Sequence, residues 1–163
     1  ALQKVEEGDI EAVMSMKNIN TDADKFYNFI QDGELEFGRF DNIEDAWKGW
    51  WGTHGREEEL TSEFKIFIQK LANDSLKLAK GVQTEGDAER VGKELLSAYD
   101  QNNSRLIKNR LLKMQEINQR TINIRKALIK NRRISQNAKP FDFEIFNEED
   151  IEFEVVKEWL QLM

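Results

Sequence analysis

Hydrophobic residues recur at helical spacing along almost every long stretch of this chain. The first clear series is Ala23, Phe26, Tyr27 and Ile30, which follow one another at i, i+3, i+4 and i+7. Thr21 and Asp24 have the spacing of a capping box just before it, with aspartate in place of the usual glutamate. Gly33 then follows as a helix stop. The pattern predicts a helix from about residue 21 to residue 33.

Two further helices are predicted in the middle of the chain. Glutamates 57–59 suit the first turn of one helix, and Gly81 suits its end. The apolar stripe of that helix is Leu60, Phe64, Phe67, Ile68, Leu71 and Leu78. Residues 84–87 repeat the capping signal and open a second helix. It carries Ala88, Val91, Leu95, Ala98 and Tyr99, and a turn follows at residues 102–104.

The longest predicted helix runs from about Ser104 to Ala138, where Pro140 disfavours helical geometry at the residue before it. At ~1.5 Å per residue, such a helix is about 50 Å long. Its apolar positions begin as one stripe and then spread around the helix, which indicates contacts on more than one side. These positions are Leu106, Ile107, Leu111, Met114, Ile117, Ile122, Ile124, Leu128, Ile129 and Ile134.

The remaining segments complete an all-α prediction. Asp41 or Asn42 could cap a short helix to about Trp51, and residues 147–150 could cap a last helix. Residues 141–146, FDFEIF, alternate apolar and acidic positions and suit a short strand or an extended arm. We expect a helical bundle or elongated helical hairpins. The predicted regions are 1–55 (acidic, with a tryptophan cluster), 56–139 (hairpin module with the long helix) and 140–163 (acidic arm and helix).

Charge is strongly segmented along the chain, although the net charge is only −7. Residues 1–60 hold 15 acidic and 6 basic side chains, a net −9, and residues 61–102 hold 7 and 6, a net −1. Residues 103–139 hold 11 basic side chains and the single Glu116, a net +10. Residues 140–163 hold 8 acidic side chains and Lys157, a net −7. The basic block therefore coincides with the longest predicted helix.

This basic helix has two interpretations. It could contact DNA phosphates without sequence preference, or it could pair with acidic segments of its own chain or of a neighbouring subunit. The sequence pI near 4.9 argues against a dedicated DNA-binding domain. The candidate contact residues for DNA backbone or an acidic partner are Arg105, Lys108, Arg110, Lys113, Arg120, Arg125, Lys126, Lys130, Arg132 and Arg133.

Three of the four tryptophans, Trp47, Trp50 and Trp51, fall within five residues. They could form a subunit contact or anchor the chain at a membrane interface. Alternatively, Trp47 and Trp51 could pack in the core and leave Trp50 partly exposed. A subunit contact is favoured over a lipid contact, because acidic surroundings are repelled by anionic headgroups.

The sequence offers little support for catalysis. The chain has no cysteine, and its one histidine, His54, lies in a glycine-flanked stretch without a nucleophile motif. A single histidine also excludes the paired Glu-x-x-His motifs of a helical di-iron site. No apolar run reaches the roughly 18 residues of a membrane span. We therefore expect no enzyme, metal site or cofactor. Because the chain starts at Ala1 and ends within an apolar pattern, we also expect a processed or excised segment.

Two stretches resemble a module of bacteriophage proteins. Residues 78–95 read LAKGVQTEGDAERVGKEL, and residues 112–121 read LKMQEINQRT. A lysine-glycine turn leads into a Gln-Thr-Glu-Gly-Asp helix start, and a long helix with an Ile-Asn-x-Arg element follows. This arrangement is similar to the internal DNA-ejection proteins of short-tailed bacteriophages. The resemblance extends over about residues 60–135, and the regions on either side match nothing that we can name.

The resemblance implies a structural protein without catalytic activity. Such proteins are packaged inside the capsid, leave with the genome and assemble into a conduit for DNA across the host envelope. The implied partners are further copies of the chain, other virion or ejection proteins, and genomic DNA through non-specific phosphate contacts. Peripheral contact with the host envelope is also implied, with a location in the virion and then in the envelope or periplasm. The alternative is a helical binding module that engages nucleic acid or an acidic protein through residues 105–133.

Overall fold

The computed structural model describes residues 2–37, 47 and 64–144, and within these residues the chain is helical. Helix α1 comprises Leu2–Phe37 and helix α3 comprises Phe64–Ala79. Helix α4 comprises Glu85–Asp100 and helix α5 comprises Ser104–Ser135. No strand occurs in the described parts of the chain. The predicted all-α class is confirmed.

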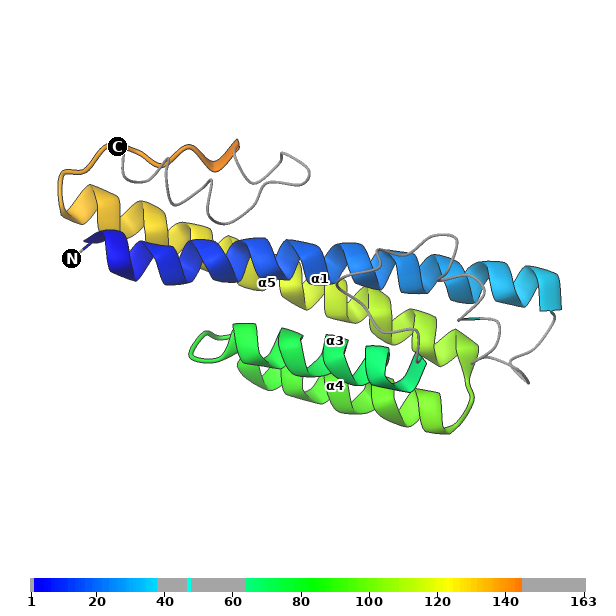
Figure 1. Ribbon diagram of the computed structural model, residues 1–163. Helices are drawn as coiled ribbons and strands as arrows, with labels where there is room; N and C mark the ends of the chain where they lie inside the picture. Colours follow the sequence, from blue (N-terminus) through cyan, green and yellow to red (C-terminus); the bar gives the residue numbers. More distant parts are fainter. Residues whose placement is uncertain (1, 38–46, 48–63, 145–163) are drawn as a thin grey trace.

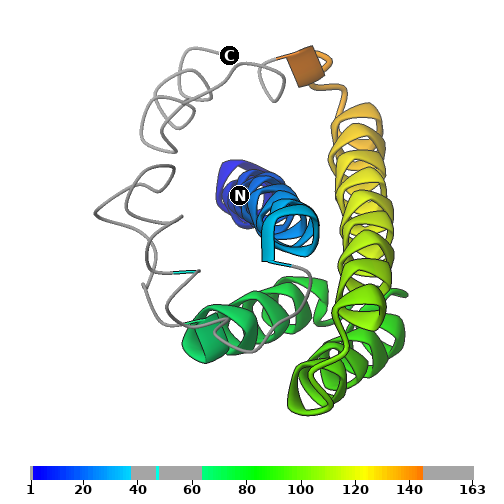
Figure 2. The same ribbon diagram turned by 90° about the vertical axis from the view of Figure 1, so that its right-hand side faces the viewer.

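The two long helices, α1 and α5, lie side by side and run in opposite directions (Figures 1 and 2). Side-chain contacts fix this orientation, because Glu6 near the start of α1 meets Arg133 near the end of α5. At the other end, Lys108 of α5 reaches Gln31 of α1. Helices α3 and α4 form a shorter hairpin that packs beside the long pair (Figure 1).

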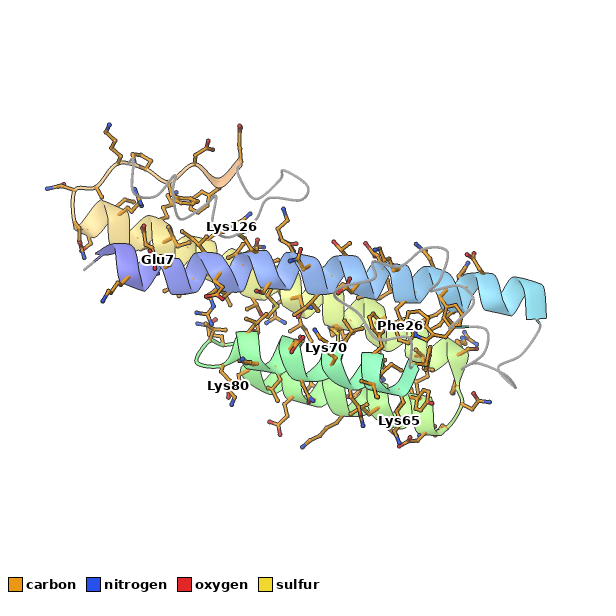
Figure 3. All side chains as sticks on the ribbon, viewed as in Figure 1. Glu7, Phe26, Lys65, Lys70, Lys80 and Lys126 are labelled. Carbon is orange, nitrogen blue, oxygen red and sulfur yellow. The ribbon has the colours of Figure 1, made fainter. Side chains whose placement is uncertain are left out.

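One apolar core joins the four helices of the described residues. An aromatic cluster of fully buried or nearly fully buried side chains forms one end of this core, namely Phe26, Phe29, Trp47, Phe64 and Phe67. Phe26 lies in edge-on contact with Trp47, with 5.5 Å between the ring centroids, and 4.7 Å from Phe64. Figure 3 shows Phe26 in the space between α1 and α3. Such edge-on aromatic pairs contribute favourable electrostatics beyond the area that they bury.

The start and end predicted for the first helix are wrong. Helix α1 continues through Thr21 and Gly33 without a break, from Leu2 to Phe37. The Thr21 hydroxyl does not cap a helix but donates to the carbonyl of Lys17, one turn earlier, at 3.1 Å. The local capping signal is overridden because buried apolar residues continue the stripe toward the N-terminus: Ile10, Val13, Met16 and Ile19.

The ends of the other helices follow their local signals. Gly81 adopts a positive φ of 80° just after α3, as expected of a glycine helix stop. Asn103 caps α5 by accepting a hydrogen bond from the amide of Leu106 at 3.0 Å. Helix α5 stops at Ser135, three residues before the predicted end, because Asn137 is left-handed at φ 53°. The amide of Ala138 then bonds back to the carbonyl of Arg133.

The short strand suggested after Pro140 is not present in the part of that segment that is described. Residues 141–144 form no strand, and Phe141 packs into the core beside Phe143, with 5.3 Å between the ring centroids. The predicted short helix to Trp51, the start of a helix at residues 57–59 and the last helix from residue 147 lie outside the described residues, apart from Trp47. Helix α1, from the predicted N-terminal region, packs along α5 of the predicted hairpin module.

The crossing of α3 and α4 provides a test of this packing. A Cβ atom on Gly92 of α4 would lie 3.3 Å from the Cβ of Ala72 on α3, whereas one on Gly86 would meet nothing within 4 Å. We expect Gly92→Leu to lower the free energy of unfolding by about 1–3 kcal/mol through overpacking. We expect Gly86→Ala to raise it by about 0.4–1 kcal/mol through reduced freedom of the unfolded chain. Urea denaturation of both variants measures these changes, and a neutral Gly92→Leu would contradict the described crossing.

Candidate functional site

Helix α5 carries all ten of the predicted basic contact residues, so its surroundings decide what these cations can bind. A buried stripe holds the helix against the other three elements. Ion pairs and hydrogen bonds then occupy most of the basic side chains from within the chain. Some of the basic residues form a buried cluster with carboxylates of α1, and two form ion pairs with α4. The others are exposed or make weaker contacts.

The most buried contact joins Arg133 of α5 to Glu6 of α1. The Arg133 guanidinium donates from Nε to Oε1 and from Nη2 to Oε2 of Glu6, both at 2.7 Å. Its Nη1 donates to the carbonyl of Lys139 at 2.8 Å, and the group lies over the Phe141 ring. The two side chains are 8% and 1% exposed. This bidentate geometry provides the pairing that a buried charge requires.

Asp9 of α1 forms the second part of the buried cluster. Arg125 donates from Nη1 to Oδ1 of Asp9 at 2.8 Å, and Arg132 pairs with the other carboxylate oxygen. Arg125 also donates to the carbonyl of Leu78, at 2.9 Å, where α3 ends. Burial lowers the pKa of Arg125 from its usual value, although arginine remains charged in proteins. Arg125 therefore ties α1, α3 and α5 together.

Two more cations of α5 pair with α4. Arg110 lies 2.7 Å from Glu94, and Arg120 lies 3.3 Å from Asp87. These side chains are a third to a half exposed, so each pair contributes at most about 1 kcal/mol to stability. They nevertheless place negative charge beside the middle of the basic helix.

The remaining basic residues of α5 differ in their surroundings. Lys108 donates to Gln31 at 3.3 Å, and Lys113 pairs with Glu116 of its own helix. Arg105 and Lys130 are exposed and make no ion pair with any described acidic residue. Lys126 lies near Lys17 of α1, and the two lysines repel each other. Burial and then this repulsion lower the pKa of Lys17.

A buried polar layer crosses the middle of the bundle. Ser75 of α3 donates to Oδ1 of Asn118 at 2.6 Å, and Nδ2 of Asn118 donates to Oδ1 of Asn20 at 2.9 Å. Gln115 donates to the Asn20 carbonyl at 3.2 Å and to Asp24. Because Asn118 is fully buried, these bonds fix the registers of α1 and α3 against α5.

The sequence stretches 78–95 and 112–121 contact each other in the structure. Thr121 donates to the carbonyl of Ile117, so its hydroxyl oxygen accepts from the hydroxyl of Thr84, at 2.5 Å. Thr84 starts α4 as predicted, but its side chain makes no capping bond and turns to Thr121 instead. The Asp87–Arg120 ion pair joins the same two stretches.

Of the three clustered tryptophans, only Trp47 lies within the described residues. Trp47 is fully buried in the aromatic core, which matches the core interpretation of the sequence and not the subunit or membrane-interface interpretation. The cause is its contact with rings from both α1 and α3. Trp50 and Trp51 lie outside the described residues.

Catalytic chemistry was not predicted from the sequence, and the described residues add no metal-binding group. No three histidine, cysteine, aspartate or glutamate side chains gather there as a metal site would require. His54 lies outside them. No helix in this part of the chain is both long and apolar enough to cross a membrane.

Sequence reasoning missed the acidic and amide partners of the basic helix. The acidic surplus of residues 1–60 predicted acidic partners in that region but did not single out Glu6 or Asp9. Asp87 and Glu94 lie in a segment with a net charge of only −1, so the charge pattern did not indicate them. The buried Asn118 and the half-buried Asn20 lie among apolar residues at helical spacing, and this spacing is the one signal that could have marked them as core-facing.

Comparison of the chain with family models, curated proteins and solved structures found no match.

The polar layer leads to a first prediction about the site. We expect Asn118→Leu to lower the free energy of unfolding by about 1–3 kcal/mol, because Ser75 and Asn20 would lose a buried partner. Asn131→Leu, at an exposed position of the same helix, is the matched control and should change it by less than about 0.5 kcal/mol. Urea denaturation measures both, and equal effects would contradict the described layer.

Lys17 gives a prediction with a defined pH dependence. Because the pKa of Lys17 is lower in the folded state, the protonated lysine reduces the free energy of unfolding at pH values below that pKa. This loss disappears as the pH rises from the folded-state pKa to above 10.5, the usual value. We therefore expect Lys17→Met to stabilise the protein at pH 7 and to lose most of this advantage at pH 11. Lys4→Met, at an exposed position of α1, should show no such change. Denaturant titrations at the two pH values provide the comparison, and a pH-independent effect of Lys17→Met would contradict this origin.

Proposed function

We propose that this chain is a non-enzymatic structural protein of a bacteriophage virion, ejected with the genome and assembled into an oligomeric conduit for DNA. Its location is the capsid interior and then the host envelope or periplasm. Its partners are further copies of the chain, other virion or ejection proteins, and the passing DNA. The contact between the two resembling stretches is the observation that carries the proposal.

These two stretches lie 37 residues apart at Thr84 and Thr121, yet they meet in a buried hydrogen bond and a nearby ion pair. Matching residues that were scattered over the surface would have no common structural role. Here they form the joint between the α3–α4 hairpin and the long helix. The resemblance therefore concerns a coherent structural unit, which favours a shared architecture over chance.

The build of the chain also suits passage through a narrow tail. A chain without cysteine contains no disulfide that must be reduced before it is extended. Helical proteins are rich in local contacts, and such proteins refold quickly. The proposal therefore includes fast refolding after passage.

The conduit can be tested with the purified chain and vesicles of phosphatidylethanolamine and phosphatidylglycerol loaded with a fluorescent dye. We expect a discrete multimer by native mass spectrometry of vesicle-bound protein, together with release of the dye. Heat-denatured protein is the control for non-specific leakage. Protein that neither associates with the vesicles nor releases dye at any salt concentration would contradict the conduit.

The alternative of a DNA-binding module predicts a different salt dependence. If all ten basic residues of α5 bound phosphates, the logarithm of the binding constant would fall with the logarithm of salt with a slope of about −9. Of these ten residues, the contacts within the described chain leave Arg105 and Lys130 for DNA, so we expect a slope of about −2. Fluorescence anisotropy with duplex DNA measures this slope, and a value near −9 would favour the binding module.

A further inference from the structure

The outer side of α5 carries a continuous stripe of exposed residues that no described element covers. Figure 2 shows α5 at one edge of the molecule, with α1 on its inner side. The stripe includes two large apolar side chains, Leu112 and Ile134, which are 52% and 66% exposed. Its members are Leu112, Glu116, Gln119, Asn123, Ala127, Lys130 and Ile134, all of them exposed. We call this set the α5 outer stripe.

The spacing of the α5 outer stripe is symmetric about Asn123. The members lie 11, 7 and 4 residues before Asn123 and 4, 7 and 11 residues after it. An 11-residue interval corresponds to three turns of a nearly straight helix, so the residues stay on one side along the whole stripe. A two-fold axis through Asn123 therefore brings each member opposite another member of the same set.

The chemistry of the stripe matches this symmetry. An antiparallel second copy would place its Ile134 against Leu112 and its Lys130 against Glu116, and the reverse pairs follow from the axis. At the centre, the two Asn123 amides would meet. Each Oδ1 already accepts from Nε2 of Gln119 on its own helix, at 3.1 Å, and its second lone pair can accept from Nδ2 of the other copy. The apolar ends of the stripe thus face each other and opposite charges face each other, while Ala127 faces Gln119 of the second copy.

The charges of the stripe are available for such a contact. Lys130 is exposed and makes no ion pair among the described residues. Among the described residues, Glu116 pairs only with Lys113, one turn away on the same helix, and its side chain is 58% exposed. An exposed pair of this kind is weak, so the carboxylate can bind a second cation at little cost.

We propose that the α5 outer stripe is an interface between two copies of this chain, packed antiparallel about a two-fold axis at Asn123. The geometry of this interface is argued from α5 alone. Its biological role, as a first step in the assembly of the conduit, rests on the proposed function. The stripe extends over 22 residue steps, or about 33 Å. The contact is therefore a concentration-dependent dimer, and larger multimers would form through other surfaces.

A chain without cysteine allows a direct test of the axis. Helices packed about 8–10 Å apart bring directly facing Cα atoms to within about 4–6 Å, which a disulfide can span. We expect Asn123→Cys to give a disulfide-linked dimer under mild oxidation. Asn109→Cys is the matched control, because it is also exposed on this side of α5 but its two copies would lie about 42 Å apart. Equal cross-linking of both variants, or of neither, would overturn the interface.

Charge exchange provides an independent test in the reduced, cysteine-free chain. Glu116→Lys or Lys130→Glu alone places like charges opposite each other twice in each dimer. We expect either variant to raise the dimer dissociation constant by about tenfold or more in analytical ultracentrifugation. The double variant restores opposite charges and should recover most of the loss. Failure of the double variant to recover would overturn the proposed register, provided that circular dichroism shows all variants folded.

The two proposals can fail separately. A chain that stays monomeric in solution but forms a dye-releasing multimer on vesicles would overturn the α5 interface and leave the conduit intact. A chain that forms the Asn123 dimer but neither associates with vesicles nor releases dye would overturn the conduit and leave the interface intact.

Discussion

The arginines of α5 that face α1 can be buried only beside negative charge, and the carboxylates of Glu6 and Asp9 on α1 supply it. Isolated buried charges carry a desolvation cost of several kcal/mol each, so Arg133 can be buried only with a partner of matching geometry. Glu6 supplies that partner with two hydrogen bonds, and Asp9 receives Arg125 and Arg132. The antiparallel orientation of the long helices is the arrangement that brings these groups together.

The same pairing sets the register of the rest of the bundle. Arg125 extends from Asp9 to the end of α3, and the Ser75–Asn118–Asn20 layer repeats the three-helix connection farther along. Polar contacts at two levels along α1 and α5 disfavour sliding, because a shifted register would leave buried groups without partners. The aromatic core then fills the opposite end, where α1 meets α3. The basic helix, whose sequence suggests nucleic-acid binding, thus uses most of its arginines to hold the bundle together. Its outer side remains exposed to other contacts.

Local sequence signals predicted those helix ends that depend on the backbone and capping chemistry of one or two residues. Gly81 and Asn103 mark helix ends through their own backbone and capping chemistry, and the structure has helix ends at both. Thr21 and Asp24 carry an equally good local signal that fails, because burial of residues on both sides outweighs one capping bond. The partners of the basic residues could be predicted only as a class. Which carboxylate meets which arginine depends on the register between helices about 100 residues apart in sequence, and no local pattern encodes that register.

A double-mutant cycle on Glu6 and Arg133 tests the central role of the buried pairing most directly. Glu6→Met, Arg133→Met and the double variant would be compared with the unaltered chain by urea denaturation. Each single variant leaves one buried charge unpaired, so we expect it to lose about 3–5 kcal/mol, whereas the double variant should lose much less. A coupling energy near zero, with the losses of the single variants simply adding in the double variant, would contradict the account.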